Sequence, residues 1–280
     1  MLRIVTDGAV DMPDEWRDEY DIQTIPINVH FGEKTYLQNV DLDLPTFYKL
    51  VAESSVFPKT SQPSPHQFVE FYKNIAKEGD TILSIHITSK LSGTYASSVA
   101  AAEELKGIYN VVPVDTLAGS MGTGFMCRAA RRMERAGKSV DEIVKYIESV
   151  REKTQVILTL DTLEYARRSG RVGTFSAALA SVLNVKPIAL LKDGLVNMVD
   201  KVRTRKAALE RVLDMGRQAY SDQPIFLGVV HASDLASGQA LLEEAKKRFN
   251  VKEAFLTDLS ISLAINFGPG TVGLILYPAE

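Results

Sequence analysis

The chain has 280 residues, of which 45% are hydrophobic, and its 32 Lys and Arg against 35 Asp and Glu give a formal net charge of −3. This balance gives no overall attraction to nucleic acid or to anionic membranes, so we expect no nucleic-acid partner. The length allows one large domain or two smaller ones. The single cysteine, Cys127, excludes an intrachain disulfide and favours a reducing compartment.

Neither a secretion signal nor a membrane span is predicted. The apolar stretch within the first six residues is too short for a signal peptide. No apolar run approaches the roughly 20 residues that cross a bilayer. We therefore expect a cytoplasmic protein that contacts a membrane at most transiently, during ligand exchange. Cys127 lies among apolar and small residues and is interpreted as a packed core thiol.

The first half of the chain alternates predicted strands with predicted helices. This alternation is typical of βαβ units, so we expect a mainly parallel sheet flanked by helices. Helix starts are marked by prolines near the first turn. The predicted strands cover residues 2–6, 22–31, 81–88 and 109–115, and the predicted helices cover 13–20, 45–54, 65–77, 93–106 and 121–136.

The second half has a different pattern, because Asp193-Gly194 between two apolar runs indicates a β-hairpin. A hairpin predicts a mixed or antiparallel sheet. The fold class is therefore α/β, with an N-terminal domain at 1–155 and a C-terminal domain at 156–280. In the second half, the predicted strands cover 155–160, 185–192, 195–202, 225–231, 251–257 and 272–277, and the predicted helices cover 140–153, 205–219 and 238–249.

The first segment suited to ligand binding runs from Thr60 to Pro65 and leads into a predicted helix. Ser64 is placed as the N-cap of that helix, with Pro65 at its first position. Thr60 and Ser61 are not needed for the cap, so we expect their hydroxyls to be available to a ligand.

The second segment runs from residue 88 to residue 95 and joins a predicted strand to an Ala-rich helix. Ligands collect beyond the carboxyl ends of strands in open parallel sheets, and a helix start offers free N–H groups to an anion. Ser92 and Thr94 add hydroxyl donors around Gly93. The alternative is that Ser92 only caps the helix.

Other motifs point away from common enzyme classes. The glycines of Gly268-Pro269-Gly270 lack the spacing of a nucleotide-binding loop and favour a turn before the last strand. A nucleophile elbow is missing. Metal-ligand spacing is also missing from the four histidines, so no metal site is expected. His86, in an apolar strand, is interpreted as a core residue with satisfied hydrogen bonds.

A series of short motifs runs along the whole chain. In chain order they are Ile4-Val5-Thr6-Asp7, Thr60-Ser61-Gln62-Pro63-Ser64, Ser92-Gly93-Thr94-Tyr95, Asp115 with Ser120, Gly122 and Gly124, Gly170-Arg171, Lys186-Pro187-Ile188, Lys201-Val202-Arg203-Thr204 and Gly268-Pro269-Gly270. Each motif is weak alone, and their shared order is specific. In this order the chain resembles, over its whole length, the DegV family of bacterial fatty-acid-binding proteins.

The resemblance implies a carrier without catalytic residues, which holds one long-chain fatty acid in a tunnel between the two domains and needs no other cofactor. It implies that a fatty-acid kinase phosphorylates the bound acid and supplies the ATP site. Arg171 and Arg203 match positions associated with docking of that kinase. The carboxylate would be bound by residues matching Thr60, Ser61, Ser92, Gly93, Thr94 and Asn266.

Two positions depart from the family pattern. Asn266 stands where the family commonly has His, and Gly8 stands where it commonly has Ser. An amide donates hydrogen bonds at every pH. We therefore expect an affinity that is nearly flat between about pH 6 and 8, provided that no other titratable group adjoins the carboxylate.

Two alternatives remain open at this point. One is a hydrolase or transferase that acts on a phosphorylated or acyl substrate at the Ser92 helix start. No general base for such a reaction is visible in the sequence. The other is a regulatory binding module whose ligand is not a lipid.

Overall fold

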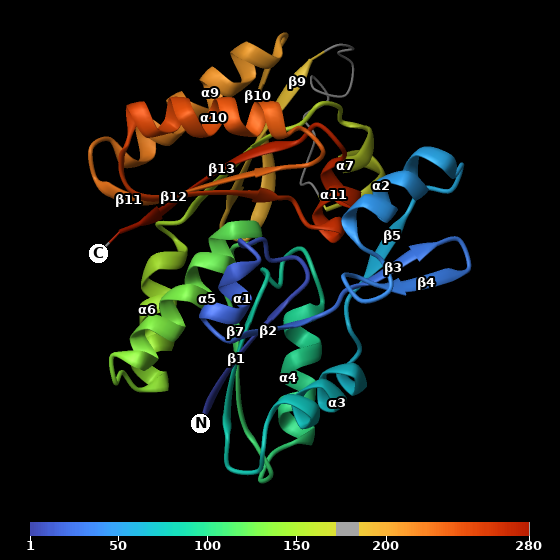
Figure 1. Ribbon diagram of the computed structural model, residues 1–280, viewed down its shortest axis with the longest axis vertical. Coiled ribbons are helices and arrows are strands. Elements are labelled where there is room, and N and C mark those ends of the chain that lie inside the picture. The colour runs from blue at the N-terminus through green and yellow to red at the C-terminus, as the bar shows by residue number, and fades with distance from the viewer. Residues whose placement is uncertain (172–184, 280) are drawn as a thin grey trace.

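The computed structural model describes residues 1–171 and 185–279. Figure 1 shows two α/β halves, one above the other, with a small sheet beside their junction. In the described part of the first half, a parallel sheet has the strand order β2-β1-β6-β7. The predicted parallel N-terminal domain is confirmed. Its strands are β1 (Leu2–Asp7), β2 (Ile22–Ile25), β6 (Thr81–His86) and β7 (Asn110–Asp115).

The second half contains a mixed sheet, whose described strands have the order β10-β9-β8-β13-β11-β12. Only the pairing of β11 with β12 is parallel among these strands, so the predicted mixed sheet is confirmed. The division at residues 155 and 156 stays a prediction. The strands are β8 (Gln155–Thr159), β9 (Lys186–Lys192), β10 (Leu195–Val202), β11 (Pro224–His231), β12 (Asn250–Asp258) and β13 (Val272–Pro278).

The predicted hairpin joins β9 to β10. Leu195 pairs with Lys192, so Asp193 and Gly194 form the two-residue loop. Both have positive φ, 52° and 78°, as a type I′ turn requires. Glycine adopts this conformation without a steric penalty, which explains the Asp-Gly sequence.

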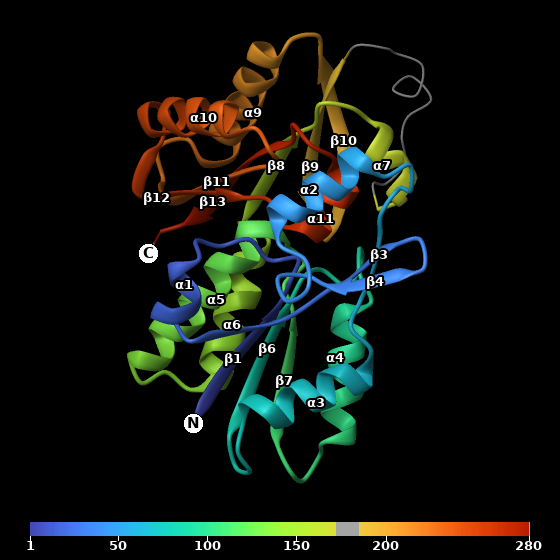
Figure 2. The ribbon, with the colours of Figure 1, turned by 45° about the vertical axis from the view of Figure 1, so that its right-hand side comes forward.

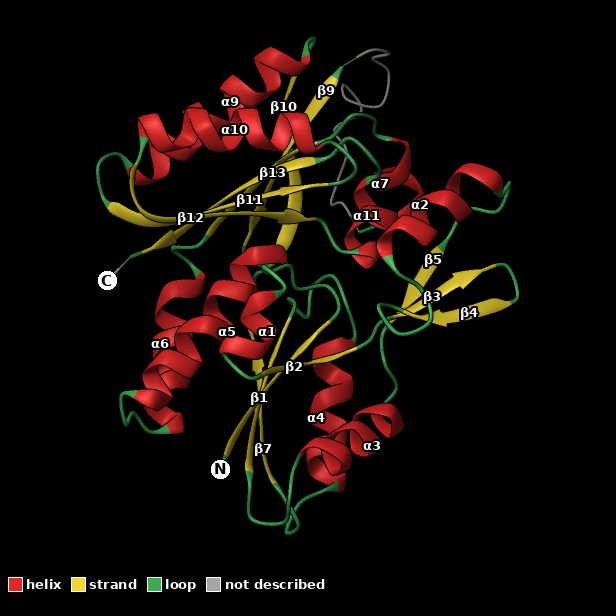
Figure 3. Cartoon of the chain, in the orientation of Figure 1, coloured by secondary structure: helices red, strands yellow, loops and turns green. Residues whose placement is uncertain are grey.

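Helices cover both faces of the parallel sheet and one face of the mixed sheet (Figure 3). The face of the mixed sheet opposite α9 and α10 packs against α5 of the N-terminal half. The described helices are α1 (Glu15–Glu19), α2 (Leu44–Glu53), α3 (Pro65–Ile75), α4 (Thr94–Glu104), α5 (Ser120–Arg135), α6 (Val140–Arg151), α7 (Glu164–Ser169), α9 (Arg205–Tyr220), α10 (Leu235–Arg248) and α11 (Ile261–Phe267).

The prediction of one strand over residues 22–31 is wrong. The segment forms β2 in the parallel sheet and then β3 (Asn28–Phe31) in a separate antiparallel sheet of order β4-β3-β5. Pro26 lies between them and has no N–H to continue the first ladder. The sequence pattern also missed β4 (Lys34–Leu37) and β5 (Lys59–Ser61), which are too short to show alternation.

One predicted helix begins earlier than expected, and two helices were missed. Helix α10 begins at Leu235 rather than Gly238, because the Asp234 side chain accepts a hydrogen bond from Ser237 N and caps an earlier start. Helices α7 and α11 were not predicted. Almost every residue of α11 is buried, so it shows no amphipathic periodicity.

One hydrophobic core cluster extends through both halves. The Trp16 ring of α1 lies 4.7 Å from the Phe255 ring of β12, measured between centroids, and Phe125 of α5 stacks on Tyr277 of β13. Cys127 lies in the same core, and burial raises the pKa of its thiol to about 12. The interpretation of Cys127 as a core thiol is confirmed. Among the described residues, no helix is long and apolar enough to cross a membrane.

Candidate functional site

A pocket of about 100 Å³ lies where the loops at the carboxyl ends of β1 and β6 meet strand β5 and helix α11. These elements converge at the junction of the two halves in Figure 2. Ligands bind at this end of a parallel sheet in other open α/β folds. The pocket is lined by Ala9, Ile27, Thr60, Ser61, Gln62, Ile87, Leu91, Ser92, Gly93, Arg171, Ser262, Leu263, Asn266 and Phe267.

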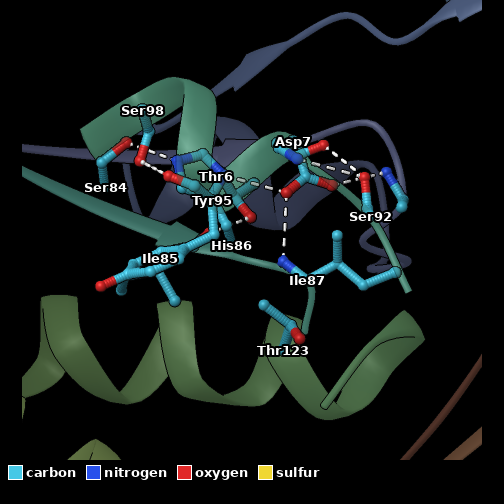
Figure 4. Close-up of polar contacts among 12 residues, drawn as sticks. Thr6, Asp7, Ser84, Ile85, His86, Ile87, Ser92, Tyr95, Ser98 and Thr123 are labelled. Atoms are coloured by element: carbon cyan, nitrogen blue, oxygen red, sulfur yellow. Dashed lines mark hydrogen bonds and ion pairs between the residues drawn. The ribbon is translucent and has the colours of Figure 1, made fainter. Parts of the chain in front are cut away.

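The buried carboxylate of Asp7, the last residue of β1, holds two walls of this pocket. Its Oδ1 accepts a hydrogen bond from Ala9 N at 2.9 Å, and its Oδ2 accepts one from Ile87 N at 3.1 Å. Figure 4 shows the second of these contacts beside Ser92. The backbone of both loops is therefore fixed from beneath the pocket.

Asp7 also anchors a chain of buried polar groups. Its Oδ2 lies 2.9 Å from His86 Nδ1, and His86 Nε2 lies 2.7 Å from Ser84 Oγ, which in turn contacts the Tyr72 hydroxyl at 2.7 Å. All four side chains are buried, and none of them lines the pocket. The interpretation of His86 as a satisfied core residue is confirmed. The Asp–His–Ser chain therefore lies beneath the pocket and not in its lining.

Ser92 lines the pocket and is held by Thr94. The Oγ of Ser92 lies 2.8 Å from Thr94 Oγ1 and accepts a hydrogen bond from Thr94 N at 3.3 Å. Gly93 occupies the N-cap position of α4, and the Ser92 hydroxyl just before it accepts from the first N–H of the helix, so the alternative that Ser92 serves the helix start stays open. Thr94 is buried behind Ser92 and does not line the pocket. Thr94 therefore contacts Ser92 from behind, and its predicted contact with the carboxylate stays a prediction.

Gly93 is needed for the close approach of Gln62. A Cβ at position 93 would lie 2.8 Å from Gln62 Nε2, closer than side chains pack. Both residues line the pocket. The absence of a side chain at Gly93 therefore leaves room for the amide end of the Gln62 side chain.

Thr60 and Ser61 reach the pocket from β5. The loop after β5 is secured by a capping box, in which Ser64 Oγ accepts from Gln67 N at 3.1 Å and Ser64 N donates to Gln67 Oε1 at 2.8 Å. The predicted N-cap at Ser64 is confirmed. Ser64 caps the helix, whereas Thr60 and Ser61 line the pocket and take no part in the cap.

Sequence reasoning missed His30, which touches Ser61 from strand β3. The His30 ring places Nε2 2.9 Å from Ser61 Oγ and Nδ1 2.9 Å from Thr35 Oγ1. No sequence signal could have found this contact, because it depends on the pairing of β3 with β5. An imidazole therefore lies beside Ser61, a predicted carboxylate ligand, and the pH dependence of the affinity stays a prediction.

Asn266 lines the pocket from α11, and its Nδ2 donates to the carbonyl oxygen of Ser262 at 2.6 Å. The amide still has a second N–H and an oxygen for the pocket.

Gly8 lies near Ser262, and its carbonyl oxygen accepts hydrogen bonds from Gln38 Nε2 at 2.6 Å and from Ser262 Oγ at 3.0 Å. A Cβ at Gly8 would lie 3.1 Å from the Gln38 amide, which favours glycine there.

Arg171 is the charged residue among those that line the described pocket, and it is exposed. Its Nη1 donates to the Ser169 carbonyl oxygen at 2.6 Å, which holds the guanidinium close to the end of α7. Arg203 lies in the exposed turn between β10 and α9 and does not line the pocket. The structure thus brings one of the two predicted docking residues to the mouth of the pocket.

The segment Gly268-Pro269-Gly270 forms a turn between α11 and β13, as predicted. Gly268 and Gly270 have φ of 86° and 77°, and Gly268 packs against the Tyr165 ring. Within the described residues, no three metal-ligating side chains cluster together.

Comparisons with known proteins match this chain to one family over nearly its whole length. A family model described as "Uncharacterised protein, DegV family" matches residues 1–279. Protein DegV of Bacillus subtilis is 30% identical over 275 residues, which are 98% of this chain and 98% of the relative.

Two solved structures have the same fold over nearly the whole length. A DegV family protein from Thermus thermophilus, described by its fatty acid binding, is 32% identical with a TM-score of 0.91, covering 99% of each chain. DegV from Bacillus subtilis, described as a fatty acid binding protein, is 28% identical with a TM-score of 0.89, covering 99% of each chain. The chain therefore belongs to the DegV family.

Proposed function

We propose that this protein is a carrier that binds one long-chain fatty acid, with its carboxylate held by Ser61 and Ser92. The observation that carries this proposal is the composition of one pocket. Hydroxyls from β5 and from the start of α4 meet there beside Arg171. The related structures described as fatty-acid-binding support the same ligand class.

The pocket suits an amphiphile because its walls are of two kinds. Hydroxyl, amide and guanidinium donors come from Thr60, Ser61, Ser92, Asn266 and Arg171. The remaining wall is mostly apolar and includes Ile27, Ile87, Leu91, Leu263 and Phe267. An anionic head with an apolar tail satisfies both walls, whereas a small polar anion would leave the apolar one unused.

The tail would supply most of the affinity. Burial of each methylene contributes about 0.8 kcal/mol, so a chain of about 15 methylenes contributes roughly 12 kcal/mol before the cost of ordering it. One hydrogen bond to the carboxylate contributes about 1.5–3 kcal/mol. The hydroxyls therefore set orientation and head-group selectivity. At about 100 Å³ the pocket accommodates the carboxylate and the first methylenes, and we propose that the rest of the tail continues between the two domains.

We further propose that the bound carboxylate is presented to a fatty-acid kinase, which supplies ATP and the catalysis. The exposed position of Arg171 at the pocket supports this role, because its charge is available to a partner there. Arg203 would serve as a second contact.

The enzyme alternative is weaker. A serine nucleophile needs a base within hydrogen-bond reach. The alternative places the reaction at Ser92, and the two contacts of Ser92 described above are both with Thr94, which is not a base.

Native mass spectrometry of the purified protein tests the proposal. We expect one co-purifying acid of long-chain mass per protein, or uptake of one added oleate or palmitate. The matching fatty alcohol serves as the control and should bind more weakly, because it lacks the negative charge. A protein that carries no lipid and takes up neither acid would contradict the carrier function.

A further inference from the structure

We infer that His30 is a positioning residue that turns the Ser61 hydroxyl into a hydrogen-bond donor toward an anionic ligand. This inference rests on the proposed function and adds the residue that makes Ser61 selective for a carboxylate.

The geometry comes from the three-stranded sheet β4-β3-β5. His30 lies on the central strand β3, directly opposite Thr35 of β4. Ser61 of β5 pairs with Asn28, two residues before His30, so Ser61 and His30 lie diagonally on one face. The ring bridges the two outer strands, with Nδ1 on Thr35 Oγ1 and Nε2 on Ser61 Oγ, each at 2.9 Å.

The direction of these hydrogen bonds decides what Ser61 offers the pocket. If Nε2 carries a proton, it donates to Ser61 Oγ, and the Ser61 proton is free to point at the ligand. If Nε2 is bare, Ser61 donates to the ring and presents only lone pairs to the pocket. A carboxylate accepts hydrogen bonds and cannot donate them, so it binds only to the first arrangement.

Thr35 provides the means of selecting that arrangement. A neutral imidazole has one donor nitrogen and one acceptor nitrogen. The Thr35 hydroxyl can donate to Nδ1, which leaves the proton on Nε2. A doubly protonated ring also keeps the Nε2 proton, so Ser61 remains a donor toward the pocket in both charge states. The sequence of donors is then Thr35 to His30, His30 to Ser61 and Ser61 to the ligand.

Calorimetry with a soluble fatty acid and with the fatty alcohol of equal length tests whether Ser61 donates to the ligand. An alcohol head can donate or accept, so it tolerates either orientation of Ser61. We expect His30→Leu to lower affinity for the acid by about tenfold and to change affinity for the alcohol by less than about twofold. His30→Gln, whose amide can donate to Ser61, should recover most of the lost affinity. His66→Gln, on the exposed surface of α3, is the matched control and should change neither.

A double-mutant cycle separates this role from a structural one. If His30 acts through Ser61, His30→Leu should have no further effect on acid affinity in a Ser61→Ala background. Two independent, multiplying losses in proteins with unchanged thermal unfolding would overturn the inference.

Long-range ¹H–¹⁵N NMR gives a second readout, because it identifies which ring nitrogen of His30 carries the proton. We expect a proton on Nε2 in the wild type. In Thr35→Val we expect a shift toward the Nδ1 tautomer and weaker acid binding. A bare Nε2 that accepts from Ser61 would overturn the inference, since that is the arrangement of a nucleophilic serine. Failure of the wild type to bind any fatty acid would instead refute the proposed function.

Discussion

The hydroxyl of Thr88 donates a hydrogen bond to the carbonyl oxygen of Gly194 at 3.1 Å and so joins the loop after β6 to the tip of the β9–β10 hairpin. This contact links the two halves of the molecule beside the loop that carries Leu91 and Ser92. The Gly194 backbone has φ of 78°, and an added Cβ would collide with the Thr88 hydroxyl. The pocket wall thus depends on a glycine that lies about 100 positions away in the sequence.

We therefore predict that Gly194→Ala destabilises the protein by two effects. Positive φ costs a residue with a Cβ about 1–2 kcal/mol. The collision with Thr88 should add about 1–3 kcal/mol, as overpacking does. Chemical denaturation measures the sum. Gly137→Ala is the matched control, because Gly137 has φ of 80° and open space around its Cα. Equal losses of unfolding free energy in both variants would show that the contact with Thr88 has no energetic weight.

A second prediction concerns Asp11, which is buried between the halves. Its Oδ2 accepts from Ser120 Oγ at 2.5 Å, and its Oδ1 accepts from Ser260 N at 2.8 Å. Burial raises the pKa of this carboxyl from 3.8 to about 6, although both hydrogen bonds oppose the shift. The folded state therefore holds the Asp11 proton more tightly than the unfolded chain does.

The sign of the pH dependence follows from that pKa. The stability contributed by Asp11 is fully present below about pH 4 and is lost as pH rises through about 6, by up to about 3 kcal/mol. Asp11→Asn should remove this decline and leave the protein more stable than wild type near pH 7. Thermal unfolding across pH 4–7 measures the difference between the two proteins. Asp14→Asn is the control, since its side chain is fully exposed. Parallel pH profiles for wild type and Asp11→Asn would contradict the prediction.

We predict that Ser92→Ala weakens binding of a soluble fatty acid while the fold stays intact. Loss of one charge-assisted hydrogen bond costs about 1.5–3 kcal/mol. The result should lie near the lower end, because Thr94 Oγ1 lies 2.8 Å from Ser92 Oγ and remains to take part of its place. Calorimetry measures the affinity. Ser98→Ala, further along α4 and outside the pocket lining, should leave it unchanged. An unchanged affinity in Ser92→Ala would remove Ser92 from the carboxylate site.

We predict that Arg171→Glu slows phosphorylation of the bound fatty acid by a cognate kinase. A charge at the mouth of a site mainly governs the encounter with a partner. Arg171 also lines the pocket, so the assay needs a fatty acid concentration that saturates the variant. Arg167→Glu, an equally exposed arginine on α7 that does not line the pocket, provides the control. A normal rate in Arg171→Glu at saturation would exclude the docking role.

Local sequence signals determined much of this molecule. The Asp193-Gly194 turn could be predicted from the sequence because a type I′ turn needs positive φ at both positions. The helix start at Ser64 and Pro65 could be predicted because capping depends on hydrogen bonds between residues a few positions apart. Because the strand ends of a parallel sheet share one edge, the sequence also predicted that Ser92 lies near a ligand. The pocket brings Ser92 together with Thr60, Ser61 and Asn266, whose roles in binding stay predictions.

Tertiary structure alone decided the rest. Residues 22–31 read as one strand, yet Pro26 ends one ladder and the chain then enters a second sheet. Helix α11 shows no amphipathic periodicity, because six of its seven residues are buried and its polar residues Ser262 and Asn266 line the pocket. The contact of His30 with Ser61 joins residues 31 positions apart through the pairing of β3 with β5. Such a contact depends on strand register. Because register is set by the packing of the whole sheet, the residues next to His30 in the sequence do not indicate it.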